Sequence, residues 1–387
     1  MPVCGIICEY DPLHRGHEKQ FRLIREQLGE NTAIVCIMSG NFTQRGLPAV
    51  FDKSVRAAAA VEAGADLVLE LPVTKVLSSA QGFAEGGVEI LDRLGIADTL
   101  CFGCESGDGT ALMQTASMLC KSEYEAELQR IMGSGVSYAS ARQQALETLG
   151  GTGALLENPN DILAVEYCKA LLERRSRIRP MALLRGGCYH DEMPDLVNPS
   201  ATAVRALMAK GEDWRPYVPE CCVPFYEQAA RHDASCGEQA VLARLRGMEK
   251  SDWEQTAHGG EGLWSKVMKA AWQAGSAEEI LTAAKSKRYP MTRLQRLVTC
   301  AYLGVTQNDL CQPISYVRAL AFSGVGSALL KKAKRNGSIP IINAGERPED
   351  AAYYDLECRA ARLYGLFAEN VDSASTALEE NIRIYRK

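Results

Sequence analysis

Hydrophobic residues in the first half of the chain form short continuous runs that alternate with longer amphipathic segments. Five runs have the length and composition of buried strands, at residues 3–7, 31–38, 65–72, 98–102 and 179–184. In the segments between them, apolar residues recur with the spacing of one helix face. Strands that alternate with helices in this way predict a parallel, doubly wound α/β sheet.

The segments between the strands predict helices at residues 18–28, 52–63, 78–94, 109–120, 122–132, 137–149 and 161–174. Gly64 suits a helix C-terminus, and Asn160 suits the N-cap of a helix that begins at Asp161. From about residue 216 onward, only helical patterns broken by turns are visible. We therefore expect an α/β domain at residues 1–198, followed by a mainly α-helical domain at residues 199–387.

The composition is typical of a cytoplasmic globular protein. Hydrophobic residues make up 47% of the chain, and no apolar run approaches the length of a membrane span. The first residues lack the basic region of a signal peptide. The 14 cysteines are scattered, often within apolar runs, as expected of reduced thiols. Cys101 and Cys104 form a lone Cys-x-x-Cys pair, and without a second pair we predict no zinc site.

The junction between the first strand and the first helix carries the most distinctive chemistry. His14 and His17 lie three residues apart and flank Gly16, and the whole chain has only five histidines. Gly16 lets the backbone approach a ligand closely, and the new helix presents free N–H groups to an anion. Two imidazole donors beside a helix N-terminus suit an α-phosphate under attack. The alternatives are a helix start with two exposed histidines, or a metal site, for which no nearby ligand set is complete.

Two further strand ends suit nucleotide binding, because open α/β sheets bind ligands beyond the carboxyl ends of their strands. Residues 39–46 follow the second strand with small residues, amide side chains and one arginine. Gly103 lies at the end of the fourth strand, followed by Cys104 and Glu105. The three strand ends together predict a phosphate-binding edge.

Together these segments closely resemble the tRNA(Met) cytidine acetate ligase family, within the nucleotidyltransferase superfamily of the HIGH-type, Rossmann-like fold. The resemblance covers residues 1 to about 305. It rests on residues 14–17, 39–46, 66–72, 102–105, 159–163, 200–205, 287–289 and 292–296. The first block is common to many adenylyltransferases, whereas the 39–46 loop and the later blocks are specific to this family.

The resemblance implies the site residues. It assigns His14 and His17 as catalytic. It assigns ATP binding to Ile7, Cys8, Glu9, Tyr10, Asp11, Pro12, Leu13, His14, Arg15, Gly16, His17, Glu18, Lys19, Gln20, Gly103, Asn160 and Arg185. No resident metal is assigned.

The resemblance also implies a two-step reaction. ATP and acetate form acetyl-adenylate, and the acetyl group then passes to the N4 amine of the wobble cytidine of elongator tRNA(Met). Adenylation gives the carboxylate a good leaving group, so positioning and charge stabilisation can carry the first step.

Four residues depart from the family pattern: Asp11, Cys104, Asp161 and Ala164, where Asn, Ser, Asn and Gly are usual. Asp11 matters most, because it places a carboxylate beside a phosphate site. It could hold Mg²⁺, which makes the ion a possible cofactor beside ATP. Alternatively, Asp11 only hydrogen-bonds the backbone of its turn.

Basic residues cluster locally although the net charge is −5. The clusters lie at residues 174–179, 285–296 and 331–335. The second adds Tyr289, a ring on which a base could stack, and helical spacing predicts Arg293 and Arg296 on one face. We expect this segment to bind the tRNA backbone, and a solvated surface is the alternative for each cluster.

Two other functions stay open from the sequence alone. One is an adenylyltransferase that acts on a small phosphorylated metabolite, but such enzymes are usually far shorter. The other is a nucleotide- or RNA-binding protein without activity, which the retained His14, Gly16 and His17 disfavour.

Overall fold

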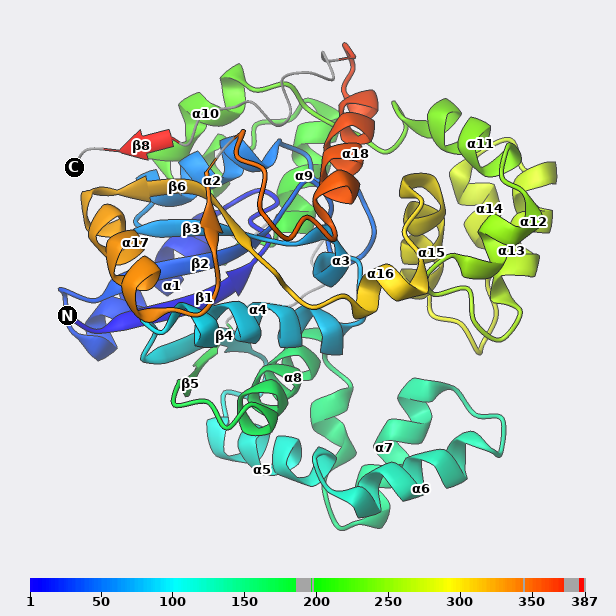
Figure 1. Cartoon of the computed structure of the whole chain (residues 1–387), viewed down its shortest axis with the longest axis horizontal. Coiled ribbons are helices and arrows are strands. Elements are labelled where there is room, and N and C mark those ends of the chain that lie inside the picture. The colour runs from blue at the N-terminus through cyan, green and yellow to red at the C-terminus, as the bar shows by residue number, and fades with distance from the viewer. Residues whose placement is uncertain (186–195, 197, 344, 372–382, 386–387) are drawn as a thin grey trace.

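A single mixed sheet organises the computed structural model, which describes all residues except 186–195, 197, 344, 372–382 and 386–387 (Figure 1). The strand order is β5-β4-β1-β2-β3-β6-β7, and β8 pairs with β6. The strands are β1 (Val3–Cys8), β2 (Ala33–Ser39), β3 (Leu67–Leu71), β4 (Thr99–Cys104), β5 (Arg179–Leu184), β6 (Val317–Ser323), β7 (Ile341–Ile342) and β8 (Arg383–Tyr385). The strands β1 to β5 are parallel, which confirms the five predicted strands and the doubly wound sheet.

Helices cover both faces of the sheet. They are α1 (Arg15–Leu28), α2 (Lys53–Glu62), α3 (Val73–Val76), α4 (Ala80–Leu94), α5 (Gly109–Leu119), α6 (Ser122–Met132), α7 (Tyr138–Thr148), α8 (Pro159–Glu173), α9 (Ala201–Lys210) and α10 (Val223–Gln228). The later helices are α11 (Glu238–Arg246), α12 (Lys250–Gln255), α13 (Leu263–Gln273), α14 (Ala277–Ala284), α15 (Met291–Leu303), α16 (Gln307–Cys311), α17 (Gly324–Asn336) and α18 (Tyr354–Tyr364).

Each face of the sheet has its own hydrophobic core, because side chains alternate along a strand. On β1, Val3 and Ile7 join the core shared with α4, α5, α8 and α17. Cys4, Ile6 and Cys8 join the opposite core, shared with α1, α2, α9 and α10. A third core lies within the helical module α11–α15 and extends to α18.

The strand β6 corrects the purely helical interpretation of the C-terminal segment. It pairs with β3 in antiparallel orientation, with Leu67 opposite Phe322. The sequence concealed this strand because Arg318 interrupts its apolar run. Inside the protein, Arg318 is 5% exposed and pairs with Glu70 of β3 and Glu357 of α18. The domain boundary near residue 198 stays a prediction.

Candidate active site at the first strand–helix junction

The N-terminus of α1 is held by the two histidines themselves. The Nδ1 atom of His14 accepts a hydrogen bond from the Gly16 amide at 3.1 Å. The Nδ1 atom of His17 accepts one from the His14 amide at 3.2 Å. Because both Nδ1 atoms are acceptors, each neutral ring carries its proton on Nε2. The reciprocal cap therefore leaves two Nε2–H donors for a ligand.

Gly16 is required by the packing of these rings. A Cβ atom at this position would lie 2.9 Å from Cε1 of His14, closer than real contacts allow. The two imidazole rings stack with centroids 3.8 Å apart. Any side chain at position 16 would therefore displace the His14 ring from its place against His17.

Both histidines are neutral in this environment. Burial lowers the pKa of His14 to about 3, and the nearby charges of Arg185 and Arg205 act in the same direction. Burial also lowers the pKa of His17, together with His14 and Arg185. Neutral imidazoles can donate hydrogen bonds to phosphate oxygens without a preceding protonation step.

We expect the folded protein to lose stability in mild acid through His14. Below pH about 6.5 the unfolded chain binds a proton at this residue, whereas the folded protein does not until about pH 3. The contribution is complete above about pH 6.5 and falls by about 1.4 kcal/mol per pH unit below it. Urea unfolding at about pH 7 and about pH 5 measures this loss, which should be smaller in His14→Asn. Equal losses in both proteins would contradict the assignment.

Asn160 closes the site through its side chain, which corrects its assignment as a helix cap. The cap of α8 is Asn158, and the helix begins at Pro159. The Nδ2 atom of Asn160 donates to Glu105 at 2.6 Å, and its Oδ1 accepts from Arg185 at 2.9 Å. The side chain of Arg185 crosses Gly103, where a Cβ atom would lie 2.8 Å from it. The structure thus brings Gly103, Asn160 and Arg185 together, and the charge of Arg185 reaches both histidines.

Several other predicted ATP contacts direct their side chains elsewhere. Tyr10 and Leu13 are buried in the core, where the Leu13 amide bonds the Tyr226 hydroxyl. Arg15 donates to the carbonyl of Pro216, and Lys19 donates to Asn198. These positions can meet a nucleotide only through their backbone or after a side-chain movement. Their assignment to ATP stays a prediction.

Arg56 is a residue of this site that the sequence did not reveal. Its side chain is 0% exposed and donates to the carbonyls of Phe51, Glu9, Ser39 and Gly40. It therefore joins the end of β1 to the end of β2. Beside it, the Glu9 carboxylate accepts a hydrogen bond from the Gln44 amide at 2.6 Å. The loop at residues 39–46 is thereby fixed against the first strand end.

Asp11 is engaged by the protein on both of its oxygens. Its Oδ1 accepts from the Val50 amide at 2.7 Å, and its Oδ2 lies 3.3 Å from Arg205. The side chain is 5% exposed. This geometry supports the interpretation in which Asp11 hydrogen-bonds backbone rather than holding an ion.

We expect Asp11→Asn to leave the magnesium requirement of the enzyme unchanged. The amide oxygen can keep the bond from Val50, so the variant loses only the ion pair with a half-exposed Arg205. That loss should cost no more than about 1 kcal/mol of stability. Titration of Mg²⁺ in a kinetic assay checks the prediction, and a shifted midpoint would restore the metal role.

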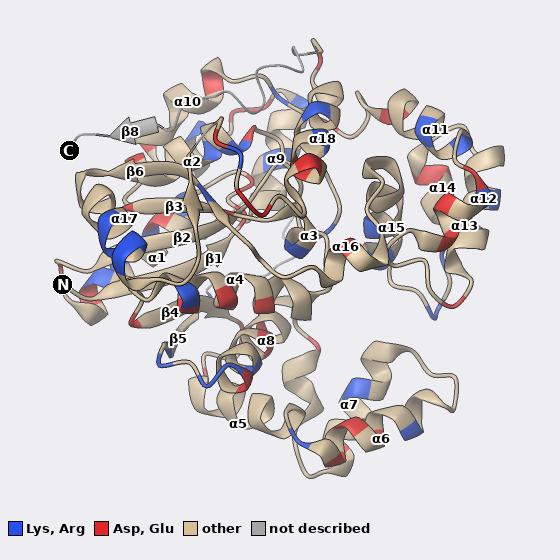
Figure 2. Cartoon of the chain, viewed as in Figure 1, with Lys and Arg blue, Asp and Glu red and all other residues tan. Residues whose placement is uncertain are grey.

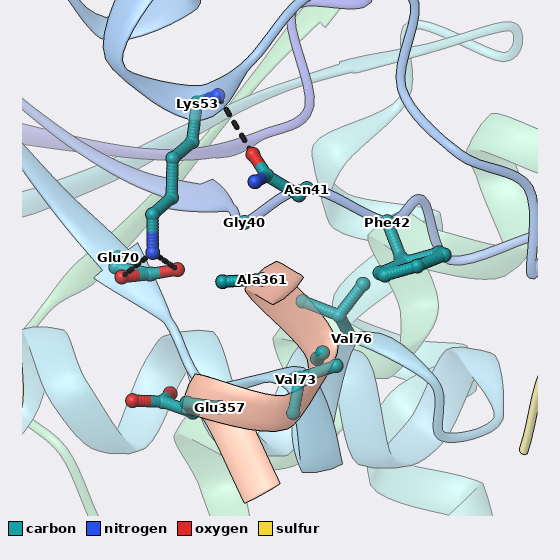
Figure 3. Close-up of a pocket in the computed structure, with 10 residues that line it drawn as sticks. Gly40, Asn41, Phe42, Lys53, Glu70, Val73, Val76, Glu357 and Ala361 are labelled. Carbon is teal, nitrogen blue, oxygen red and sulfur yellow. Dashed lines mark hydrogen bonds and ion pairs between the residues drawn. The ribbon is translucent and has the colours of Figure 1, made fainter. Parts of the chain in front are cut away.

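A second polar cluster contacts the 39–46 loop (Figure 3). Lys53 of α2 donates to both oxygens of Glu70 at 2.7 and 2.9 Å, and its amide bonds Asn41. Glu357 of α18 lines the same small cavity of about 20 Å³, and its pKa rises to about 7 because of burial and the charge of Glu70. Such a cavity has room for about one water molecule. The cluster ties α18 and the loop to the sheet.

The Cys-x-x-Cys pair does not converge on a common site. Cys101 and Cys104 point to opposite faces of β4, because Cys101 joins one core and Cys104 the other. Elsewhere in the described part of the chain, no group of three or more His, Cys, Asp or Glu side chains could hold a metal ion.

No helix among the described residues is long and apolar enough to cross a membrane.

The fold separates Arg293 and Arg296, which were predicted to share one basic face of α15. The assignment of Arg296 to that face is wrong. Arg296 is 8% exposed and donates to the Gln44 carbonyl at 3.3 Å, so it faces the 39–46 loop. Burial lowers the pKa of its guanidinium to about 10. Arg293 donates to the carbonyl of His258 and lies near Glu261. Arg296 therefore positions the loop and is not placed to follow a phosphate ridge.

Comparison with known proteins identifies relatives of the chain over nearly its whole length. The family model described as HIGH Nucleotidyl Transferase matches residues 1–379. A tRNA(Met) cytidine acetate ligase of Anoxybacillus flavithermus is 34% identical over 94% of each chain. One of Alkaliphilus metalliredigens is 33% identical over 96% of this chain and 95% of its own. Crystal structures of Thermotoga maritima TmcAL, one bound with alpha-thio ATP and one apo, match all of both chains with TM-scores of 0.90 and 0.93, at 28% and 29% identity.

Proposed function

Because the chain belongs to the HIGH nucleotidyl transferase family, and within it to the tRNA(Met) cytidine acetate ligases, we propose that it is an ATP-dependent ligase that acetylates tRNA. It uses ATP and acetate to form acetyl-adenylate. It then transfers the acetyl group to the N4 amine of the wobble cytidine of elongator tRNA(Met). The observation that carries the proposal is the pair of Nε2–H donors that the reciprocal cap leaves at the N-terminus of α1.

In the first step, an acetate oxygen attacks the α-phosphorus of ATP and pyrophosphate leaves. Negative charge accumulates on the phosphate oxygens as the new bond forms. The Nε2–H groups of His14 and His17 donate to these oxygens, and the first amides of α1 add their dipoles. Arg185, held by Asn160, supplies the positive charge beside them. The chain provides position and charge, and no covalent intermediate with the protein forms.

In the second step, the cytidine N4 amine attacks the acetyl carbon and AMP leaves. The amine loses one proton as the amide forms. We assign the α/β part, residues 1–198, to ATP and acetate, and the part from residue 199 onward mainly to tRNA. Since its substrate is a tRNA, we place the enzyme in the cytoplasm.

Radiolabelled acetate tests the whole proposal. When purified protein is incubated with ATP, radiolabelled acetate and elongator tRNA(Met), label should appear in the RNA. A matched transcript with uridine at the wobble position has no N4 amine and should stay unlabelled. ATP consumption without RNA labelling, but with transfer of AMP to a small phosphorylated compound, would instead support the metabolite adenylyltransferase.

A further inference from the structure

One tryptophan on the helical module is exposed in a way that packing does not explain. Trp272, near the end of α13, is 55% exposed, whereas Trp214 and Trp253 are 3% and 0% exposed. Tryptophan is on average a highly buried residue, so an exposed indole is a large apolar ring that is free to contact a ligand. The helix has one buried face and one exposed face, and Trp272 lies on the exposed face.

The exposed face of α13 combines this ring with cations. The buried face consists of Leu263, Val267, Met268, Ala270 and Ala271. Lys266, Lys269 and Trp272 are all exposed and recur every three residues, so they form one stripe along the opposite side. The stripe spans about 9 Å, the rise of six helical residues.

The stripe continues into the basic segment that precedes α15. The Nζ atom of Lys266 donates to the carbonyl of Lys285 at 3.3 Å, which joins the two. Lys285 and Lys287 are exposed beside it. Within the described residues, none of these four lysines forms an ion pair. Basic and acidic residues are interspersed along α11–α15 (Figure 2), whereas the charged members of this stripe are all lysines.

Tyr289, the ring first expected to stack on a base, is already occupied. The guanidinium groups of Arg288 and Arg293 lie 5.8 and 5.1 Å from its ring centroid. Its hydroxyl donates to the Glu261 carbonyl, and Glu261 also pairs with Arg288 at 2.8 Å. The tyrosine therefore holds the basic segment together, and Trp272 is the ring that faces solvent.

The module also lies against the active-site loop. Arg296 of α15 bonds the Gln44 carbonyl, and Thr299 bonds the Gly46 carbonyl. The Gln44 amide in turn bonds Glu9 at the end of β1. RNA held on this module would thus be held by an element that directly contacts the catalytic edge.

We propose that Lys266, Lys269 and Trp272 of α13, with Lys285 and Lys287, form a binding surface for unpaired nucleotides of the RNA substrate. The indole stacks on one base, and the lysines neutralise neighbouring phosphates. Lysine is depleted at protein–protein interfaces, so this composition favours RNA over a protein partner. The inference rests on the proposed function, because it names where that substrate is held.

Binding of an anticodon stem-loop RNA tests the stripe separately from catalysis. Trp272→Ala should weaken binding about fivefold to a hundredfold, the loss typical of one stacked base. Trp272→Phe keeps an aromatic ring and should retain most of the affinity. Tyr138→Ala removes a ring that is 51% exposed on α7 and serves as the matched control.

Salt dependence distinguishes the two kinds of contact. Lys269→Ala should reduce the log–log salt slope of RNA binding by about 0.7, whereas Trp272→Ala should leave the slope unchanged. Acetate-dependent ATP turnover without RNA should be wild-type in both variants. Wild-type RNA binding by Trp272→Ala, or an equal loss of RNA affinity in Tyr138→Ala, would overturn the proposed role of the stripe in RNA binding. Failure of the unmodified enzyme to acetylate tRNA would overturn the proposed function instead, since the binding assay does not depend on it.

Discussion

Replacing His14 or His17 with asparagine is expected to slow acetyl-adenylate formation by about 10²–10³-fold, because each change removes one preorganised donor to the phosphate. The asparagine Oδ1 atom can take the place of the imidazole Nδ1, which caps the helix in both cases. The fold and the start of α1 should therefore persist. Acetate-dependent exchange of labelled pyrophosphate into ATP, without tRNA, measures the step.

Arg15 provides the matched control for these variants. It lies between the histidines in sequence, but its side chain is exposed and donates to the Pro216 carbonyl. Arg15→Ala should exchange pyrophosphate at nearly the wild-type rate. A histidine variant that keeps full exchange, with an unchanged melting temperature, would show that its imidazole does not stabilise the transition state.

The sequence predicts this junction well because its information is local. The strand at residues 3–7, the helix that follows and the spacing of His14 and His17 lie within one short segment. Strand ends of a parallel sheet meet at one edge, so the loop at residues 39–46 and Gly103 follow from topology. What the spacing could not show is the reciprocal cap, which determines that Nε2 carries the proton of each ring.

Two of the errors share a physical cause, which is a buried charge. Arg318 interrupts the apolar run of β6, and its ion pairs with Glu70 and Glu357 are what make it compatible with a buried strand. Arg296 looked like a surface residue because it recurs with helical spacing, yet it bonds a loop some 250 residues earlier in the chain. Partners so distant in sequence leave no local signal, and a charged residue in an amphipathic pattern is normally a solvated one.

Arg56 is the clearest example of a buried charge. Its replacement by methionine is expected to destabilise the protein by about 3–5 kcal/mol. Four carbonyl groups at the ends of β1 and β2 and before α2 would lose their donor while staying buried. Arg25 gives a matched control at the other end of the sheet, since it bonds the Gly64 carbonyl and Asp66 but is partly exposed. Arg25→Met should cost about 1 kcal/mol. Denaturant unfolding of the three proteins compares them.

The variant Arg56→Lys distinguishes the geometry of the guanidinium group from its positive charge. A lysine ammonium keeps the positive charge, but it lacks the planar fork that reaches the Glu9, Ser39 and Gly40 carbonyls together. The strand ends should therefore separate, and with them the loop whose Gln44 amide bonds Glu9. We expect this variant to fold at low temperature but to bind ATP weakly, as measured by calorimetry below its melting temperature. Wild-type ATP affinity in Arg56→Lys would show that charge alone is sufficient and that the two strand ends do not need a common donor.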